Sequence, residues 1–184
     1  MVRHSKICGR RPFLGWSLAA GGALLLPGTK GARAAGAAAR QLRFHNLHTG
    51  ESLTAVYWEG GRYVAEGLAQ IDYMLRDFRT GDVYTIDPKL LDLVHQVQIV
   101  MEDDGAVDVI SGYRSPATNA MLASRSDGVA KNSFHLKGMA IDLRLRKGRL
   151  EDLRAAAWSL GSGGVGYYPN SDFVHMDTGP LRTW

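Results

Sequence analysis

The chain has 184 residues, of which 45% are hydrophobic and 22% charged, which suits one domain with its own hydrophobic core. The formal net charge of +4 arises in the first 35 residues, which hold six basic residues and no acidic one; the rest carries 16 basic and 18 acidic residues. The charge therefore gives no support to a nucleic-acid partner. The single cysteine, Cys8, also lies in this first part, which excludes disulfide and thiol chemistry from the remainder.

Residues 1–35 have the pattern of an export signal. Arg10-Arg11 precede an apolar run at 13–26, and Ala32-Arg33-Ala34 matches a cleavage site. The paired arginines indicate the twin-arginine route, which carries folded proteins. The run is shorter than the roughly 20 residues of a membrane span, so we expect cleavage near Ala34, with an uncleaved membrane tether as the alternative. The predicted location is the periplasm, and the predicted domain is 36–184.

The remaining pattern predicts an α+β domain in which helices pack on a small antiparallel sheet that carries the late motifs. Apolar spacing, turn residues and the Asp87-Pro88 helix cap define the expected elements. They are strands at 41–45 and 53–58, helices at 68–78 and 88–101, a strand at 106–110, a helix at 116–122, a strand at 138–145, a helix at 150–160, and strands at 164–168 and 173–177.

The segments SFHLKGMAID and DFVHMD contain three candidate metal ligands, His135, Asp142 and His175. Strand alternation places Asp142 opposite the apolar side of its strand, and an acidic residue in such a strand is costly unless it is paired or binds a metal. A His-Asp-His set suits zinc with one position left for water. Asp177 lies on the same face as His175 and could accept its second ring N–H. The alternative is that these are ordinary polar residues on half-buried strands.

Two further residues are candidates for catalysis. Asp172 precedes His175 by three positions and could act as general base if the chain is irregular at 169–171; the alternative is a turn-capping aspartate. Arg114 follows a strand and precedes a helix, where its guanidinium could bind a carbonyl oxygen or a carboxylate. The alternative for Arg114 is a surface arginine.

The segments SGYRSPATN, SFHLKGMAID and GGVGYYPNSDFVHMDTG, with the final RTW, resemble the zinc-dependent murein peptidases. This is the D-Ala-D-Ala carboxypeptidase and endopeptidase family, which shares a fold with the hedgehog signalling domain. The likeness covers nearly all of 36–184 and is greatest for the twin-arginine-exported endopeptidase branch. Many relatives carry Glu three residues before the last ligand or His two before it, where this chain has Asp172 and Phe173.

The resemblance implies that His135, Asp142 and His175 bind Zn²⁺ and that Arg114 is the arginine of the family's S-G-Y-R segment. It implies an endopeptidase that hydrolyses peptide cross-links of peptidoglycan with an activated water, whose proton Asp172 takes. The alternatives are a D-Ala-D-Ala carboxypeptidase and a non-catalytic zinc-containing peptidoglycan-binding module. The branch suggests 3-3 rather than 4-3 cross-links. The expected partners are peptidoglycan stem peptides and, for the signal, the twin-arginine machinery; the expected state is a monomer.

Overall fold

The computed structural model describes residues 38–125 and 130–184, so the predicted export signal lies outside the described residues. In these ranges no helix combines the length and the apolar character that crossing a membrane requires. The strands are β1 (Arg40–Asn46), β2 (Ser52–Glu59), β3 (Arg62–Tyr63), β4 (Val107–Ser111), β5 (Ala140–Arg144), β6 (Gly164–Tyr168), β7 (Phe173–Asp177) and β8 (Arg182–Thr183). The helices are α1 (Ala65–Met74), α2 (Pro88–Val100), α3 (Pro116–Ala123) and α4 (Leu150–Ser159), with two 3₁₀ turns, η1 (Phe134–Lys137) and η2 (Pro169–Ser171).

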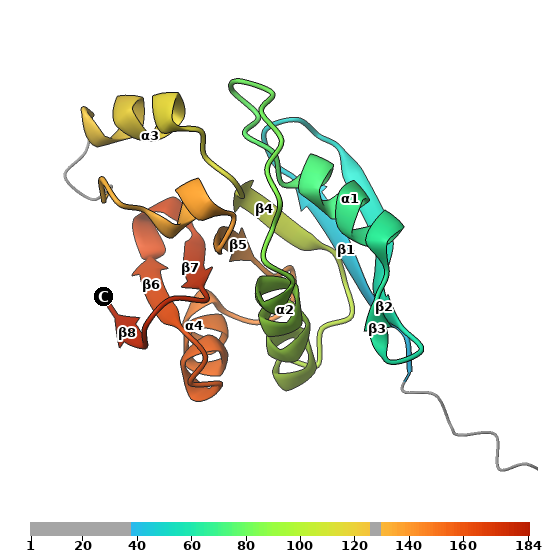
Figure 1. The fold of residues 1–184 in the computed structure, drawn as a ribbon. Coiled ribbons are helices and arrows are strands. Elements are labelled where there is room, and N and C mark those ends of the chain that lie inside the picture. The colour runs from blue at the N-terminus through green and yellow to red at the C-terminus, as the bar shows by residue number, and fades with distance from the viewer. Residues whose placement is uncertain (1–37, 126–129) are drawn as a thin grey trace, which may run out of the picture. The chain divides into compact units, whose positions relative to one another are not determined.

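The strands form one sheet in the order β3-β2-β1-β4-β5-β7-β6-β8 (Figure 1). Neighbours are antiparallel except for the pairs β1–β4 and β6–β8, which are parallel. The predicted α+β class is thereby confirmed. The sheet is larger than expected and mixed, because the parallel β1–β4 pair joins the N-terminal hairpin to the strands with the late motifs.

One face of the neighbouring inner strands β5 and β7 belongs to the hydrophobic core. Ile141, Leu143, Val174 and Met176 are fully buried there, together with apolar residues of α2 and α4. Successive side chains of a strand point to opposite faces, so Asp142 is directed away from this core. The alternation predicted for this strand is confirmed, and it fixes the face on which the polar site forms.

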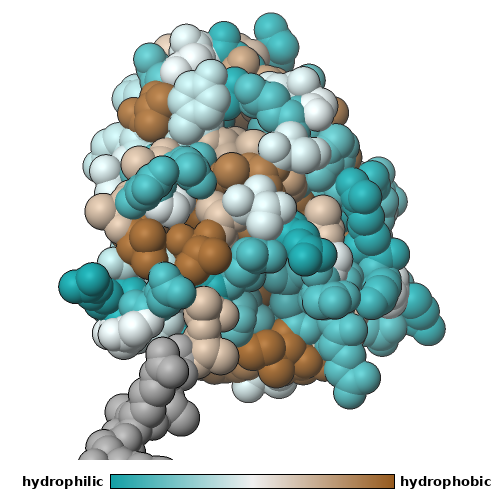
Figure 2. All heavy atoms as spheres, turned by 90° about the vertical axis from the view of Figure 1, so that its right-hand side faces the viewer, coloured by the Kyte–Doolittle hydropathy of each residue, from teal (hydrophilic) through white to brown (hydrophobic). Residues whose placement is uncertain are grey.

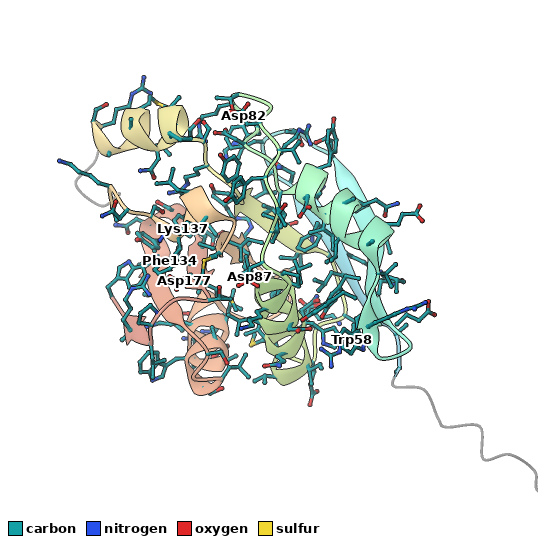
Figure 3. All side chains as sticks on the ribbon, viewed as in Figure 1. Trp58, Asp82, Asp87, Phe134, Lys137 and Asp177 are labelled. Carbon is teal, nitrogen blue, oxygen red and sulfur yellow. The ribbon has the colours of Figure 1, made fainter. Side chains whose placement is uncertain are left out.

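The start of α2 supports the loop that follows β7. Asp87 caps the helix as predicted, since its carboxylate accepts the Lys89 N–H at 3.0 Å and Pro88 occupies the first turn. The other Asp87 oxygen accepts the Thr178 hydroxyl at 2.8 Å, and the Asp87 N–H donates to the Gly138 carbonyl at 2.9 Å. Figure 3 labels Asp87 beside Asp177, and the two lie close together because Thr178 directly follows Asp177.

At the other end of the sheet, α1 packs directly on β2. A Cβ at Gly67 would lie 1.9 Å from the Val56 carbonyl oxygen, so only glycine permits this approach. Figure 2 shows the side of the molecule that is on the right in Figure 1. Hydrophilic side chains predominate on it, and hydrophobic ones form small separate areas. Ala55 and Tyr57 of β2 and Ile71 and Met74 of α1 are buried, so these two elements turn apolar side chains inward.

The first helix is shorter than the apolar stripe predicts. It ends at Met74 and is capped by Leu75, so the predicted extension to Phe78 is wrong. Phe78 lies in the following turn, where its ring stacks on His48 of the β1–β2 hairpin with centroids 4.1 Å apart. A hydrophobic residue at helical spacing thus serves a tertiary contact outside the helix. The two-residue strands β3 and β8 were also not expected.

Asp77 fixes the turn after α1 to the start of α3. Its carboxylate accepts the N–H groups of Arg79 at 3.0 Å and Ser115 at 2.9 Å, and Ser115 caps α3. Burial alone would raise the pKa of Asp77, but hydrogen bonds from Thr118, Ser115 and Arg79 outweigh it and lower the pKa to about 2. Because Arg114 directly precedes Ser115, the same contact holds the candidate arginine in place.

We expect Asp77→Ala to lower the free energy of unfolding by about 2 kcal/mol at pH 7. The carboxyl pKa is lower in the folded than in the unfolded chain, so this contribution is complete above about pH 4 and disappears as the pH falls towards 2. Urea unfolding at several pH values measures the difference, with the exposed Asp82→Asn as control. A difference that does not shrink on acidification would contradict the assignment.

Candidate metal centre

The three candidate ligands come from two paired strands and a 3₁₀ turn. Asp142 on β5 and His175 on β7 are direct partners in the antiparallel register. His135 lies in η1, which Ser133 begins by accepting the His135 N–H at 3.3 Å and which Gly138 ends in the left-handed region, at φ 64°. The turn brings His135 over the strand pair, so residues up to 40 positions apart meet.

The facing atoms of these side chains form a small triangle. The Nε2 of His135 lies 3.2 Å from the Nδ1 of His175, and the Oδ1 of Asp142 lies 3.2 Å and 2.8 Å from these two nitrogens. All three residues are buried. Ligands about 2.1 Å from a tetrahedral zinc ion are about 3.4 Å apart, so the three atoms are spaced for one metal ion.

Each imidazole makes a hydrogen bond on the side of its ring that faces away from the triangle. This bond determines which ring nitrogen carries the proton and which keeps a lone pair for a metal. The Nδ1 of His135 lies 2.7 Å from the Gly112 carbonyl, which can only accept, so Nδ1 carries the proton and the Nε2 lone pair faces the triangle. The Nε2 of His175 lies 2.9 Å from the Oδ2 of Asp177, which leaves its Nδ1 free in the same way. This second contact matches the prediction for Asp177. Two nitrogen lone pairs and a carboxylate oxygen then converge, as metal binding requires.

The groups around the triangle favour the ionised form of Asp142 and shift the pKa values of the two histidines in opposite directions. Burial opposes ionisation of Asp142, but His135, His175 and Arg114 together hold its pKa well below the usual range. Burial lowers the pKa of His135. Burial also acts to lower the pKa of His175, yet hydrogen bonds to Asp142 and Asp177 outweigh it and raise that pKa.

The triangle lies at the base of a cavity of about 630 Å³. Its lining combines cationic, small polar and aromatic side chains from η1, β6, β7 and the C-terminal strand. Besides the three candidate ligands, the lining residues are Arg114, Ala130, Asn132, Ser133, Phe134, Tyr168, Ser171, Phe173, Arg182 and Trp184. A polar and aromatic cavity of this size can receive a peptide segment above the ligand atoms.

Arg114 lies beside the triangle. Its Nη2 donates to the Oδ2 of Asp142, and its Nε donates to the Ser111 hydroxyl at 2.9 Å. Its backbone N–H also donates to the His135 carbonyl at 3.2 Å. The guanidinium is therefore fixed at the cavity wall, with further N–H groups left for a bound carbonyl.

Asp172 takes a different position. The expected irregularity is present, since η2 precedes Asp172 and the residue itself is left-handed, at φ 54°. Its carboxylate, however, pairs with Arg144 and is 62% exposed. It lines a neighbouring hollow of about 460 Å³ together with Asp108 and Arg146, and it is not among the lining of the cavity above the triangle. Its role as general base remains a prediction from the sequence.

Arg182 and Trp184 belong to the final RTW segment that contributes to the family resemblance, and both reach the site from the C-terminal end of the chain. The sequence assigned neither of them a role. Arg182 donates to Asp177, and the Trp184 ring lies 5.2 Å from the His175 ring. The signal available in the sequence was GGVG at the start of β6. A Cβ at Gly164 would lie 2.6 Å from atoms of Arg182 and Asp177, and a Cβ at Gly166 would lie 2.7 Å from Trp184. Such glycines indicate that other groups approach the strand closely.

A buried His-Asp-His triangle beneath an open cavity is an arrangement that metal-dependent hydrolases use. Comparison with known proteins gives the family: residues 34–184 match the model of "Peptidoglycan L,D-endopeptidase MepK". The chain is 44% identical over 175 residues to peptidoglycan L,D-endopeptidase MepK of Escherichia coli K12, covering 95% of this chain and 96% of the relative. It is 45% identical over 146 residues to a probable MepK of Haemophilus influenzae, covering 79% and 78%.

The chain belongs to the peptidoglycan L,D-endopeptidase MepK family. No solved structure is significantly similar to it. The family confirms the murein peptidase resemblance found in the sequence and the predicted class of enzyme, a metallopeptidase that hydrolyses peptidoglycan. It does not favour the carboxypeptidase or the non-catalytic binding module.

In the metal-free protein we expect His175 to take up a proton at higher pH than His135. The pKa of His175 is raised by its carboxylate partners and that of His135 is lowered by burial, so protonation proceeds in this order as the pH falls. Nitrogen-15 NMR of the imidazole rings during a pH titration measures both. Earlier protonation of His135 would contradict the arrangement of hydrogen bonds.

Proposed function

We propose that this chain is a zinc-dependent endopeptidase that cleaves L,D peptide bonds in the cross-links of peptidoglycan. The observation that carries the proposal is the convergence of His135 Nε2, His175 Nδ1 and Asp142 Oδ1 beneath the cavity. The names of the relatives supply the bond type, and the 3-3 cross-link is the expected target.

Zinc is the metal that we propose for this donor set. Two imidazole nitrogens and one carboxylate oxygen, with room for a fourth ligand, are typical of hydrolytic zinc sites. A zinc ion held by these residues would activate a water molecule and polarise the scissile carbonyl. The protein itself keeps both imidazoles in the tautomers that bind metal, through the Gly112 carbonyl and Asp177.

Arg114 is proposed to bind the carbonyl oxygen of the scissile bond and the negative charge that develops on it. Ser111 and Asp142 hold its guanidinium in advance, so little reorganisation is needed during the reaction. Arg182 is the other arginine of the cavity lining, and it is paired with Asp177. The names of the relatives favour internal cleavage over carboxypeptidase action.

Because the proposed substrate is peptidoglycan, we expect the enzyme to act in the cell envelope. Export by the twin-arginine route, with cleavage near Ala34, would deliver a folded protein to the periplasm. The sequence pattern of residues 1–35 supports this part of the proposal.

Zinc-loaded protein incubated with intact peptidoglycan sacculi should convert cross-linked muropeptide dimers to monomers. His175→Ala removes one ligand nitrogen, so we expect it to lose zinc and at least 10³-fold of activity. Chromatography of the released muropeptides measures the conversion and identifies the bond cut. Release of terminal D-alanine alone would contradict the endopeptidase assignment, and zinc binding without any cleavage would favour a binding module.

The Asp172 assignment predicts that Asp172→Asn lowers kcat by about 10²-fold or more while zinc content is unchanged. For this role the carboxylate must leave Arg144 and turn towards the cavity. Arg144→Gln is the informative companion variant, because it releases Asp172 and should preserve kcat. Unchanged kcat in Asp172→Asn would show that another group takes the proton.

A further inference from the structure

We propose that Arg182 is a positioning residue of the metal centre, which orients the ligand His175 by holding Asp177. The inference rests on the proposed zinc site but adds a residue and a segment to it. The segment is the C-terminal strand β8, which pairs with β6 at the edge of the sheet.

The first step is the pairing of Arg182 with Asp177. Its Nη2 donates to Oδ2 at 2.6 Å, and its Nη1 donates to Oδ1 at 3.1 Å. This two-point geometry fixes the plane of a carboxylate, which a single charge on a flexible chain does not. The same Oδ2 accepts the Nε2 of His175 at 2.9 Å, so one oxygen joins the guanidinium to the ligand imidazole.

The second step is that hydrogen bonds from neighbouring groups fix the position of the Asp177 carboxylate. It is completely buried, and its Oδ1 also accepts the N–H groups of Gly164 at 3.1 Å and Gly179 at 2.8 Å. A buried carboxylate is costly unless a cation lies close to it, and Arg182 supplies that charge. Loss of the guanidinium would leave the carboxylate held by the two backbone donors alone, so its Oδ2 would be less firmly placed against His175.

The third step is that Arg182 itself is held in place. Its guanidinium carbon lies 5.0 Å from the ring centroid of Phe134 and 5.0 Å from that of Trp184, so the cation lies against two aromatic rings. Phe134 belongs to η1, which also carries His135. Figure 3 labels Phe134 and Asp177, whose side chains lie close together beside β7. A Cβ at Gly164 would collide with both Arg182 and Asp177, so β6 is shaped to admit this pair.

The contacts distinguish positioning from direct substrate binding. Arg182 lines the cavity, but its Nη1 and Nη2 are both engaged with Asp177, and Nη1 also donates to the Pro180 carbonyl at 2.9 Å. Its effect should therefore pass through Asp177 and His175 to the metal, and not to the substrate. Zinc affinity is the quantity that this effect changes.

The test measures the zinc dissociation constant of the full chain by competition with a chromogenic chelator. The variants are Arg182→Gln, Arg182→Lys, Asp177→Asn and the double variant Asp177→Asn with Arg182→Gln. Arg149→Gln is the matched control, because Arg149 pairs with Glu151 at 3.4 Å on the surface. Circular dichroism and thermal unfolding of the metal-free proteins verify that each variant is folded.

We expect Arg182→Gln to weaken zinc binding about ten- to a hundredfold, as changes of groups that orient metal-bound histidines do. Arg182→Lys should fall between Gln and wild type, since it keeps the charge but not the two-point contact. The double variant should bind zinc no more weakly than Asp177→Asn alone, because the two residues act on His175 through one contact.

Wild-type zinc affinity in folded Arg182→Gln would overturn the proposal, and so would additive losses in the double variant. A change in KM for peptidoglycan at unaltered zinc affinity would reassign Arg182 to substrate binding. If the wild-type chain binds no zinc, the proposed metal centre itself fails, and this outcome is separate from the others.

Discussion

The site depends on one buried charge, the carboxylate of Asp142. It is 2% exposed and would be strongly unfavourable alone, since several kcal/mol are lost when an ion leaves water without a partner. One of its oxygens faces both imidazoles, and the other accepts from Arg114. The carboxylate thus links the candidate ligands to the candidate oxyanion-binding group, and removing it would release both.

The topology explains why these groups meet. The antiparallel pairing of β5 with β7 sets Asp142 beside His175, and η1 brings His135 over the pair. The hydrophobic side chains that alternate with the site residues along β5 and β7 face α2 and α4. These two helices therefore lie on the side of the sheet opposite the site. The late strands carry the ligands, and the earlier elements supply the support, through Asp87 at Thr178 and Asp77 at Ser115.

The sequence was most informative where one physical rule decided the outcome. Alternation along β5 and β7, with the Asp87-Pro88 cap, predicted elements whose bounds differ from the structure by at most a few residues. It was less informative where tertiary contacts decide. Phe78 fits the helical stripe but stacks on His48, and Asp172 has the expected spacing but pairs with Arg144. Arg182 lies five residues beyond Asp177, in a strand too short to show a period, so only the folded chain reveals their contact.

The central claim is that His135 Nε2, His175 Nδ1 and Asp142 Oδ1 bind one zinc ion. Anomalous X-ray diffraction at the zinc absorption edge, from crystals of the zinc-loaded protein, tests this claim most directly. The account predicts a single strong peak about 2.1 Å from each of these three atoms. A peak at other residues, or none in the triangle when zinc is in excess, would contradict it.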